Sequence, residues 1–110
     1  MSQVVMVVRT TLTGATAEEY EAWADTAIPE IAMELGATTA LRMWSRATPN
    51  LHISSYRFDS DEAFQEAEQN RRPAIIERVT AHWGDKVTRE FEILDVAQFI
   101  TTAPAAKAAE

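Results

Sequence analysis

The chain has 110 residues and a formal net charge of −7, with 46% hydrophobic residues, 25% charged residues and no cysteine. This length and composition predict one globular domain, and they exclude disulfides, thiolate metal sites and a cysteine nucleophile. The negative charge argues against binding to nucleic acid or to an acidic membrane surface, because phosphate groups are bound by basic surfaces.

The first third of the chain predicts a strand followed by an amphipathic helix. Residues 3–10, QVVMVVRT, are compact and rich in β-branched side chains, which is typical of a buried strand. Thr16 and Glu19 have the spacing of a capping box, and apolar residues then recur at helical spacing until Gly36, which ends the helix. Pro29 lies inside this helix, where it should bend the axis and open a gap against the sheet.

A β-hairpin is predicted in the middle of the chain. Residues 37–46 and 51–58 both alternate, and the turn ATPN lies between them. Large side chains occur at both parities, since Leu41 and Met43 alternate with Trp44. Both faces of the sheet should therefore be apolar.

The last part of the chain predicts a broken helix and a fourth strand. Asp59 and Glu62 have the spacing of a second capping box. Pro73 interrupts the helix that follows, so we expect a break just before it and a second helical piece at 74–83. Period-two alternation then predicts a strand at 86–96.

The element order is strand, helix, strand, strand, helix, strand. With right-handed crossovers, this order predicts an α+β fold of the ferredoxin-like βαββαβ type: a four-stranded antiparallel sheet with both helices on one face. A sheet that is apolar on both faces but covered on only one requires a partner. We therefore expect a homodimer in which two sheets pack face to face.

Residues 1–100 are expected to form this single domain, and the small-residue segment 101–110 is expected to be a flexible C-terminal tail. No apolar run approaches the ~20 residues that cross a bilayer, and the first residues lack a basic leader. The chain is therefore expected to be cytoplasmic and not to bind membranes.

Over about residues 3–96, the chain resembles a known superfamily, the dimeric α+β barrels. Within that superfamily it looks most like an uncharacterised bacterial family. The resemblance rests on Tyr20, Trp23, the triplet Ile28-Pro29-Glu30, Gly36 and the junction at residues 55–60. That family commonly has a histidine at the position occupied here by Ala27, so this chain lacks one titratable group of the pattern.

The resemblance implies a fold but no single activity, because more distant members include antibiotic-biosynthesis-type monooxygenases that use no cofactor, polyketide cyclases and isomerases. Three functions stay open. The first is a small apolar or aromatic ligand pocket between sheet and helices. The second is cofactor-independent monooxygenase, cyclase or isomerase activity on a small aromatic or polyketide-like substrate. The third is a structural or regulatory dimer without catalysis.

The predicted ligand pocket is aromatic. Tyr20 and Trp23 lie on the apolar face of the first helix, and Trp44 and Tyr56 lie on predicted strands. All four could pack in the core instead, where the phenol and indole groups would still need hydrogen-bond partners.

Two polar residues are the candidates for chemistry. His52 can act as a general base near neutral pH, and Arg42 can hold an anionic oxygen in bidentate fashion. The alternative is structural, with Arg42 paired to Glu90 or Glu92. The enzyme hypothesis requires His52, Arg42 and an aromatic residue to face one cavity.

Metal and nucleotide sites are not predicted. The two histidines have no metal-ligand spacing, and glycine is too scarce for a phosphate-binding loop. We therefore expect no metal and no cofactor.

Overall fold

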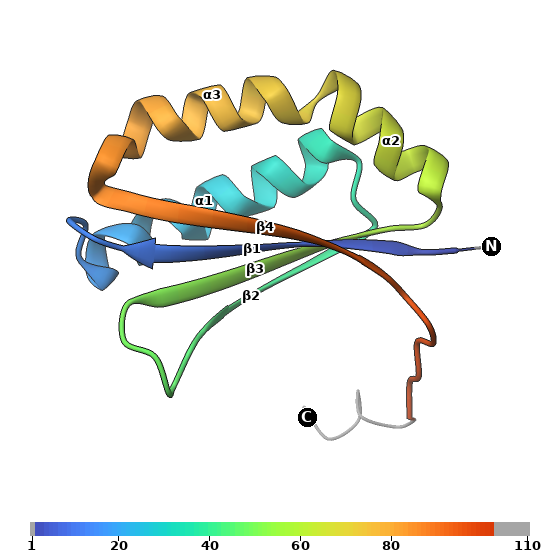
Figure 1. Cartoon of the computed structure of the whole chain (residues 1–110), viewed down its shortest axis with the longest axis horizontal. Coiled ribbons are helices and arrows are strands. Elements are labelled where there is room, and N and C mark those ends of the chain that lie inside the picture. Colours follow the sequence, from blue (N-terminus) through green and yellow to red (C-terminus); the bar gives the residue numbers. More distant parts are fainter. Residues whose placement is uncertain (1, 103–110) are drawn as a thin grey trace.

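A four-stranded antiparallel sheet organises the structure, which is a computed structural model that describes residues 2–102. The strands are β1 (Val4–Leu12), β2 (Thr39–Trp44), β3 (Leu51–Phe58) and β4 (Val87–Asp95), in the spatial order β2-β3-β1-β4. The two chain-terminal strands β1 and β4 are therefore neighbours, and β2 and β4 form the edges (Figure 1).

Three helices cover one face of this sheet (Figure 1). They are α1 (Ala17–Leu35), α2 (Asp61–Asn70) and α3 (Arg72–Trp83), and a short 3-10 turn, η1 (Gly84–Lys86), leads into β4. This arrangement confirms the ferredoxin-like α+β fold with helices on one face. Dimerisation stays a prediction.

The helix boundaries follow from local chemistry. Both hydrogen bonds of the capping box between Thr16 and Glu19 are present, and Gly36 adopts the left-handed φ of 76° that ends α1. The second predicted capping box is wrong. The side chain that caps α2 is that of Ser60, which accepts from the backbone N–H of Ala63, so the helix begins one residue later than the pattern indicated.

The predicted helix break also occurs. Arg71 separates α2 from α3 with a non-helical φ of −122°, and Pro73 lies in the first turn of α3. Proline is tolerated there because the N–H groups of a first turn have no intrahelical partner. The second piece therefore starts at Arg72, two residues before the predicted start.

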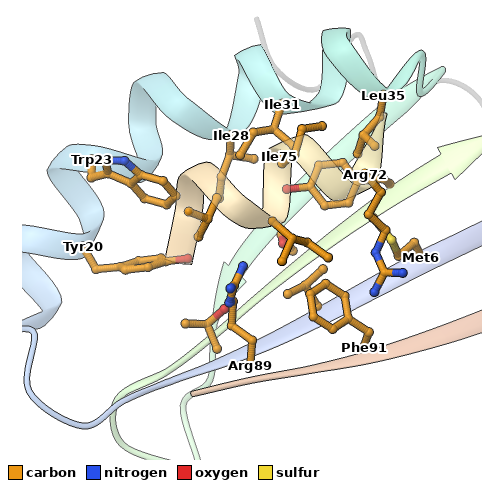
Figure 2. A pocket seen from close by; sticks show the side chains of 16 residues that line it. Met6, Tyr20, Trp23, Ile28, Ile31, Leu35, Arg72, Ile75, Arg89 and Phe91 are labelled. Carbon is orange, nitrogen blue, oxygen red and sulfur yellow. The ribbon is translucent and has the colours of Figure 1, made fainter. Parts of the chain in front are cut away.

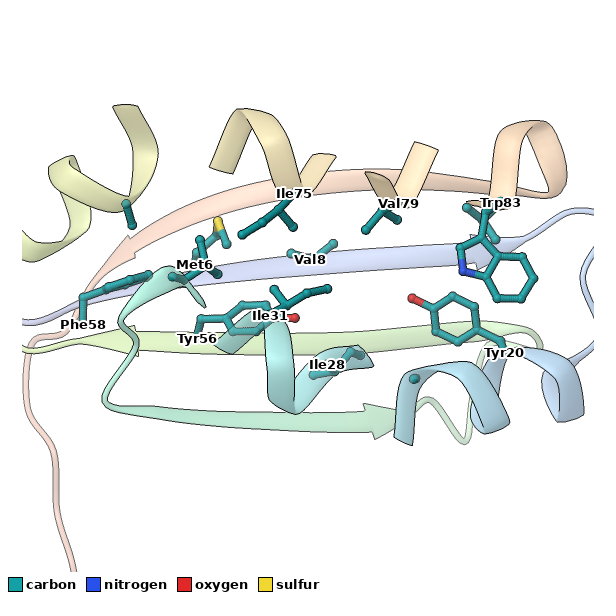
Figure 3. Close-up of a cluster of buried hydrophobic side chains, with 14 of the residues drawn as sticks. Met6, Val8, Tyr20, Ile28, Ile31, Tyr56, Phe58, Ile75, Val79 and Trp83 are labelled. Carbon is teal, nitrogen blue, oxygen red and sulfur yellow. The ribbon is translucent and has the colours of Figure 1, made fainter. Parts of the chain in front are cut away.

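The core lies between the sheet and the helices. Alternate residues of each strand point toward the helices, and the apolar residues of α1 and α3 meet them (Figure 3). Labelled members of this cluster include Met6, Val8, Ile28, Ile31, Ile75 and Val79.

The opposite face of the sheet also carries apolar side chains. Leu41 and Met43, at the odd positions of β2, are 60% and 39% exposed. The polar part of this face includes the ion pair of Arg9 with Glu92, at 3.0 Å. The sheet is therefore apolar on both faces, as the alternation predicted.

Two predictions about chain organisation stay open. The assignment of residues 1–100 to one domain stays a prediction, and most of the predicted tail, 103–110, lies outside the described residues. Among the residues that are described, no helix is both long enough and apolar enough to span a membrane.

Candidate functional site

A cavity of about 50 Å³ lies between the sheet and helices α1 and α3 (Figure 2). Its walls are mainly apolar, and they come from three strands and from both long helices. Lining residues that frame it include Met6, Val8, Ile28, Ile31, Ile75 and Phe91.

Two tyrosines bring polar groups into this apolar lining. Tyr20 comes from the first turns of α1 and Tyr56 from β3, and each is only 4% exposed. Burial raises the pKa of both phenols, while the hydroxyls of Thr10 and Ser54 oppose that rise for Tyr20 and Tyr56 respectively. Both tyrosines are therefore neutral at pH 7 and can donate a hydrogen bond.

Two guanidinium groups lie beside the phenyl ring of Phe91 in the same lining. The distances from the ring centroid are 4.3 Å for Arg72 and 5.9 Å for Arg89. Figure 2 shows both side chains next to Phe91, one from the start of α3 and the other from β4. Positive charge is thus concentrated at one part of an apolar cavity.

The two arginines differ in their partners. Arg72 forms an ion pair with Glu68 at 2.7 Å, whereas Arg89 donates to the neutral hydroxyl of Thr80 at 2.8 Å. Within residues 2–102, Arg89 has no ion pair. Burial, together with the positive charge of Arg72, lowers the pKa of Arg89. An anion bound here would oppose both effects, because an opposite charge favours the charged form of the guanidinium.

The alternation of β4 explains why Arg89 faces the cavity. Val87, which is buried, Arg89 and Phe91 occupy every second position, and these positions are paired with the helix-facing residues of β1. The sequence pattern did not single out Arg89, although its shared parity with Val87 was a usable signal. Arg72 was missed because a position next to a proline was taken only as a helix break.

Arg42 lies elsewhere and is paired with two carboxylates. Its guanidinium donates to both carboxylate oxygens of Glu21, at 2.8 and 2.7 Å, and to Asp25 at 3.3 Å. The predicted pairing of Arg42 with Glu90 or Glu92 is wrong. They are on the outer face of β4 at the far edge of the sheet, whereas Arg42 points toward α1 from the opposite edge strand.

His52 is completely buried, with 0% of its surface exposed. Its ring packs against Tyr20 and Trp44, with centroid distances of 5.0 and 4.9 Å. Neither ring nitrogen has a hydrogen-bond partner among the described residues. Burial, with a contribution from the charge of Arg42, lowers the pKa of His52 to about 4, so the ring is neutral at pH 7.

The structure therefore brings only part of the predicted site together. Tyr20, Trp23 and Tyr56 line the cavity, and Trp44 lies beside it with its indole N–H donating to Glu21 at 2.8 Å. His52 and Arg42 are not among the residues that line it. Their predicted catalytic roles stay predictions.

The described residues contain no group of three or more histidine, aspartate or glutamate side chains placed to hold a metal ion. The cavity offers arginine, tyrosine, threonine and serine groups instead. These groups are suited to hydrogen bonding with an organic anion.

Known structures share this fold. SnoaB, a cofactor-independent oxygenase from Streptomyces nogalater, is 24% identical over 93% of this chain and 100% of its own, with a TM-score of 0.67. A NIPSNAP family protein of unknown function from Agrobacterium tumefaciens is 17% identical over 89% and 91% of the two chains, with a TM-score of 0.65. A putative antibiotic biosynthesis monooxygenase from Caulobacter crescentus is 18% identical over 87% and 91%, with a TM-score of 0.63.

No protein-family model matches this chain, and no curated protein matches it. At these identities the likeness to solved structures shows the fold alone. It confirms the ferredoxin-like α+β fold that the sequence predicted.

Proposed function

We propose that this protein binds a small aromatic or polyketide-like anion in the cavity between the sheet and the helices. The observation that carries this proposal is the position of Arg89, a partly buried cation in an apolar lining that has no acidic partner within residues 2–102. A buried charge is stabilised by an opposite charge, and a guanidinium matches the geometry of a carboxylate or phenolate. The aromatic walls match the remainder of such a ligand.

The ligand must enlarge the cavity when it binds. The cavity has a volume of about 50 Å³, whereas a cavity that holds benzene measures ~150 Å³. Phe91 is 37% exposed on an edge strand, and the side chain of Arg72 is 20% exposed. We infer that these two side chains move outward when the ligand enters, because neither is enclosed on all sides.

Binding can be tested with a charged ligand and its neutral analogue. Calorimetry would compare benzoate with benzamide on the wild-type protein, on Arg89→Met and on Arg9→Met, which changes an arginine on the outer face. Because hydrogen bonds to charged groups contribute about 1.5–3 kcal/mol, we expect Arg89→Met to weaken benzoate binding about 10- to 100-fold. Benzamide affinity and the Arg9→Met variant should show no such change. Equal benzoate affinity in wild type and Arg89→Met would overturn the proposal.

A second candidate function is cofactor-independent oxygenation of the bound ligand. It is favoured by the fold shared with SnoaB and by a cation placed where a phenolate could form. In such a reaction Arg89 would stabilise the phenolate, and the substrate itself would supply the electrons that reduce one oxygen atom of dioxygen to water. Dioxygen uptake in the presence of a dihydroxynaphthalene and a chelator, lost in Arg89→Met, would support it.

We also propose that two copies associate through the outer face of the sheet. Leu41 and Met43 are exposed there, and a second copy would bury them against the same surface of its partner. Light scattering should then give a dimer for the wild-type protein and a monomer for Leu41→Asp, because the substitution buries an unpaired charge. A monomeric wild-type protein would exclude this assembly.

A further inference from the structure

A second hollow lies directly outside the cavity. It is a groove of about 250 Å³ between α1 and α3, and its lining includes Ala27 and Glu30 from α1 and Arg78 and His82 from α3. The cavity and the groove have three lining residues in common, namely Trp23, Ile31 and Val79. These three side chains therefore form the wall between the two hollows.

Trp23 is the least buried part of this wall. Ile31 and Val79 are each only 8% exposed and belong to the core, whereas Trp23 is half-buried. None of the hydrogen bonds formed among residues 2–102 involves its indole N–H. Aromatic and apolar contacts, including an edge contact with Trp83 at 5.5 Å, hold the indole in place, and Figure 2 shows it above Tyr20 at one end of the cavity.

Aromatic neighbours of Trp23 line both hollows. On the cavity side, Tyr20 lies at a centroid distance of 5.3 Å. On the groove side, the ring of His82 lies at 5.6 Å and at an interplanar angle of 20°. An aromatic ring of a ligand that replaced the indole would stack on His82 and lie tilted against Tyr20.

We infer that the cavity and the groove are two halves of one elongated site, and that its ligand is an aromatic anion of two or three fused rings. This inference rests on the proposed function. The acidic end of the ligand would lie at Arg89, and its far ring would lie in the groove beside His82. Trp23 would move aside to admit it.

Volume supports a ligand of this length. The cavity alone is smaller than one aromatic ring requires, but cavity and groove together come to about 300 Å³, the lower end of the ~300–1,000 Å³ typical of small-molecule sites. Displacement of the indole makes the two volumes continuous.

Charge in the groove defines the far end of the ligand. Arg78 is already occupied by Glu34, with hydrogen bonds of 2.9 and 2.6 Å to its two carboxylate oxygens. Glu30 forms no hydrogen bond or ion pair within residues 2–102, so its carboxylate can accept from a hydroxyl group. The far ring should therefore carry a hydroxyl group and no second acidic group.

A substitution that fills only the groove tests the inference. Ala27 lines the groove but not the cavity, and a tryptophan at this half-buried surface position would occupy the groove. The control is Ala22→Trp, an exposed position on the same helix. The ligands are benzoate, 2-naphthoate and anthracene-2-carboxylate, and the measurement is calorimetric affinity.

We expect Ala27→Trp to weaken binding of the two larger anions about 10-fold, which equals about 1.4 kcal/mol, and to change benzoate affinity less than about 2-fold. Ala22→Trp should change none of the three affinities. As a second variant, Trp23→Ala should strengthen binding of anthracene-2-carboxylate, because the wall is then absent before the ligand arrives.

The outcomes separate this inference from the proposed function. If benzoate binding depends on Arg89 but neither Ala27→Trp nor Trp23→Ala changes the affinity of the larger anions, the elongated site is wrong and the proposed function holds. If no anion of the series binds in an Arg89-dependent manner, the proposed function fails and the elongated site fails with it.

Discussion

Arg42 and Arg89 project from the same face of one sheet, yet their surroundings are opposite. Near Arg42 lies the paired end, which we define as Glu21, Arg42, Trp44 and His52. The guanidinium of Arg42 and the indole N–H of Trp44 both donate to the carboxylate of Glu21. Near Arg89 lies the open end, which we define as Arg72, Arg89 and Phe91, where the only hydrogen-bond partner of the Arg89 guanidinium within residues 2–102 is the hydroxyl of Thr80.

The difference between the two arginines indicates which partly buried cation is available to a ligand. A guanidinium that is already paired with two carboxylates gains no new ion pair by binding an anionic ligand. A guanidinium that is bonded only to a hydroxyl does gain one. We therefore expect the paired end to contribute stability and the open end to provide the proposed binding site.

The largest expected effect concerns His52 at the paired end. Its pKa falls from the ordinary 6.5 to about 4 in the folded protein, so the unfolded chain takes up a proton at a higher pH than the folded one. Stability is therefore fully present above pH 6.5 and is lost as the pH falls toward 4. At 1.36 kcal/mol for each pKa unit, we expect the free energy of unfolding to fall by about 2–3 kcal/mol over this range.

Urea unfolding at a series of pH values measures this loss. The variant His52→Phe keeps an aromatic ring in the packed position but cannot take up a proton, so its free energy of unfolding should vary less between pH 6.5 and 4. An unchanged pH dependence in His52→Phe would show that another group is responsible.

A smaller effect compares the two arginines directly. Arg42→Met removes two charged hydrogen bonds to Glu21, and we expect it to lower the free energy of unfolding by about 1–2 kcal/mol, less than for a fully buried pair because Glu21 is 48% exposed. Urea unfolding at pH 7 gives the value, and Arg42→Met should bind benzoate as the wild type does.

Arg89→Met is the matched variant at the open end. It removes a cation that is partly buried near Arg72, so the free energy of unfolding should change by less than about 0.5 kcal/mol, while benzoate binding weakens about 10- to 100-fold. A large loss of stability in Arg89→Met, with intact binding, would mean that the roles of the two ends are reversed.

Much of the fold was predictable because local signals agreed with one another. The capping box at Thr16 and Glu19, the left-handed Gly36 and the break before Pro73 each act over a few residues, and all three appear in the structure. The α2 cap was mispredicted because Ser60 and Asp59 are both competent capping residues, and the choice between them depends on where the chain leaves β3.

The site was less predictable because partners far apart in sequence decide it. Arg42 and Arg89 are both arginines in strands, and only the strand order shows that Glu21 can reach the first of them while Glu90 cannot. Tyr20, Trp23 and Tyr56 were predictable as a group, since aromatic residues on the inner faces of a helix and a strand must converge.

The place of Trp23 between two hollows has an evolutionary consequence. Recognition of charge would depend on Arg89 in a strand, and recognition of length would depend on one side chain of a helix at the other end of the cavity. Substitutions at position 23 or 27 could then change which ring systems fit without altering how the anionic group is held. Relatives with this arrangement could diverge in the size of their ligands by single substitutions and keep the same acidic anchor.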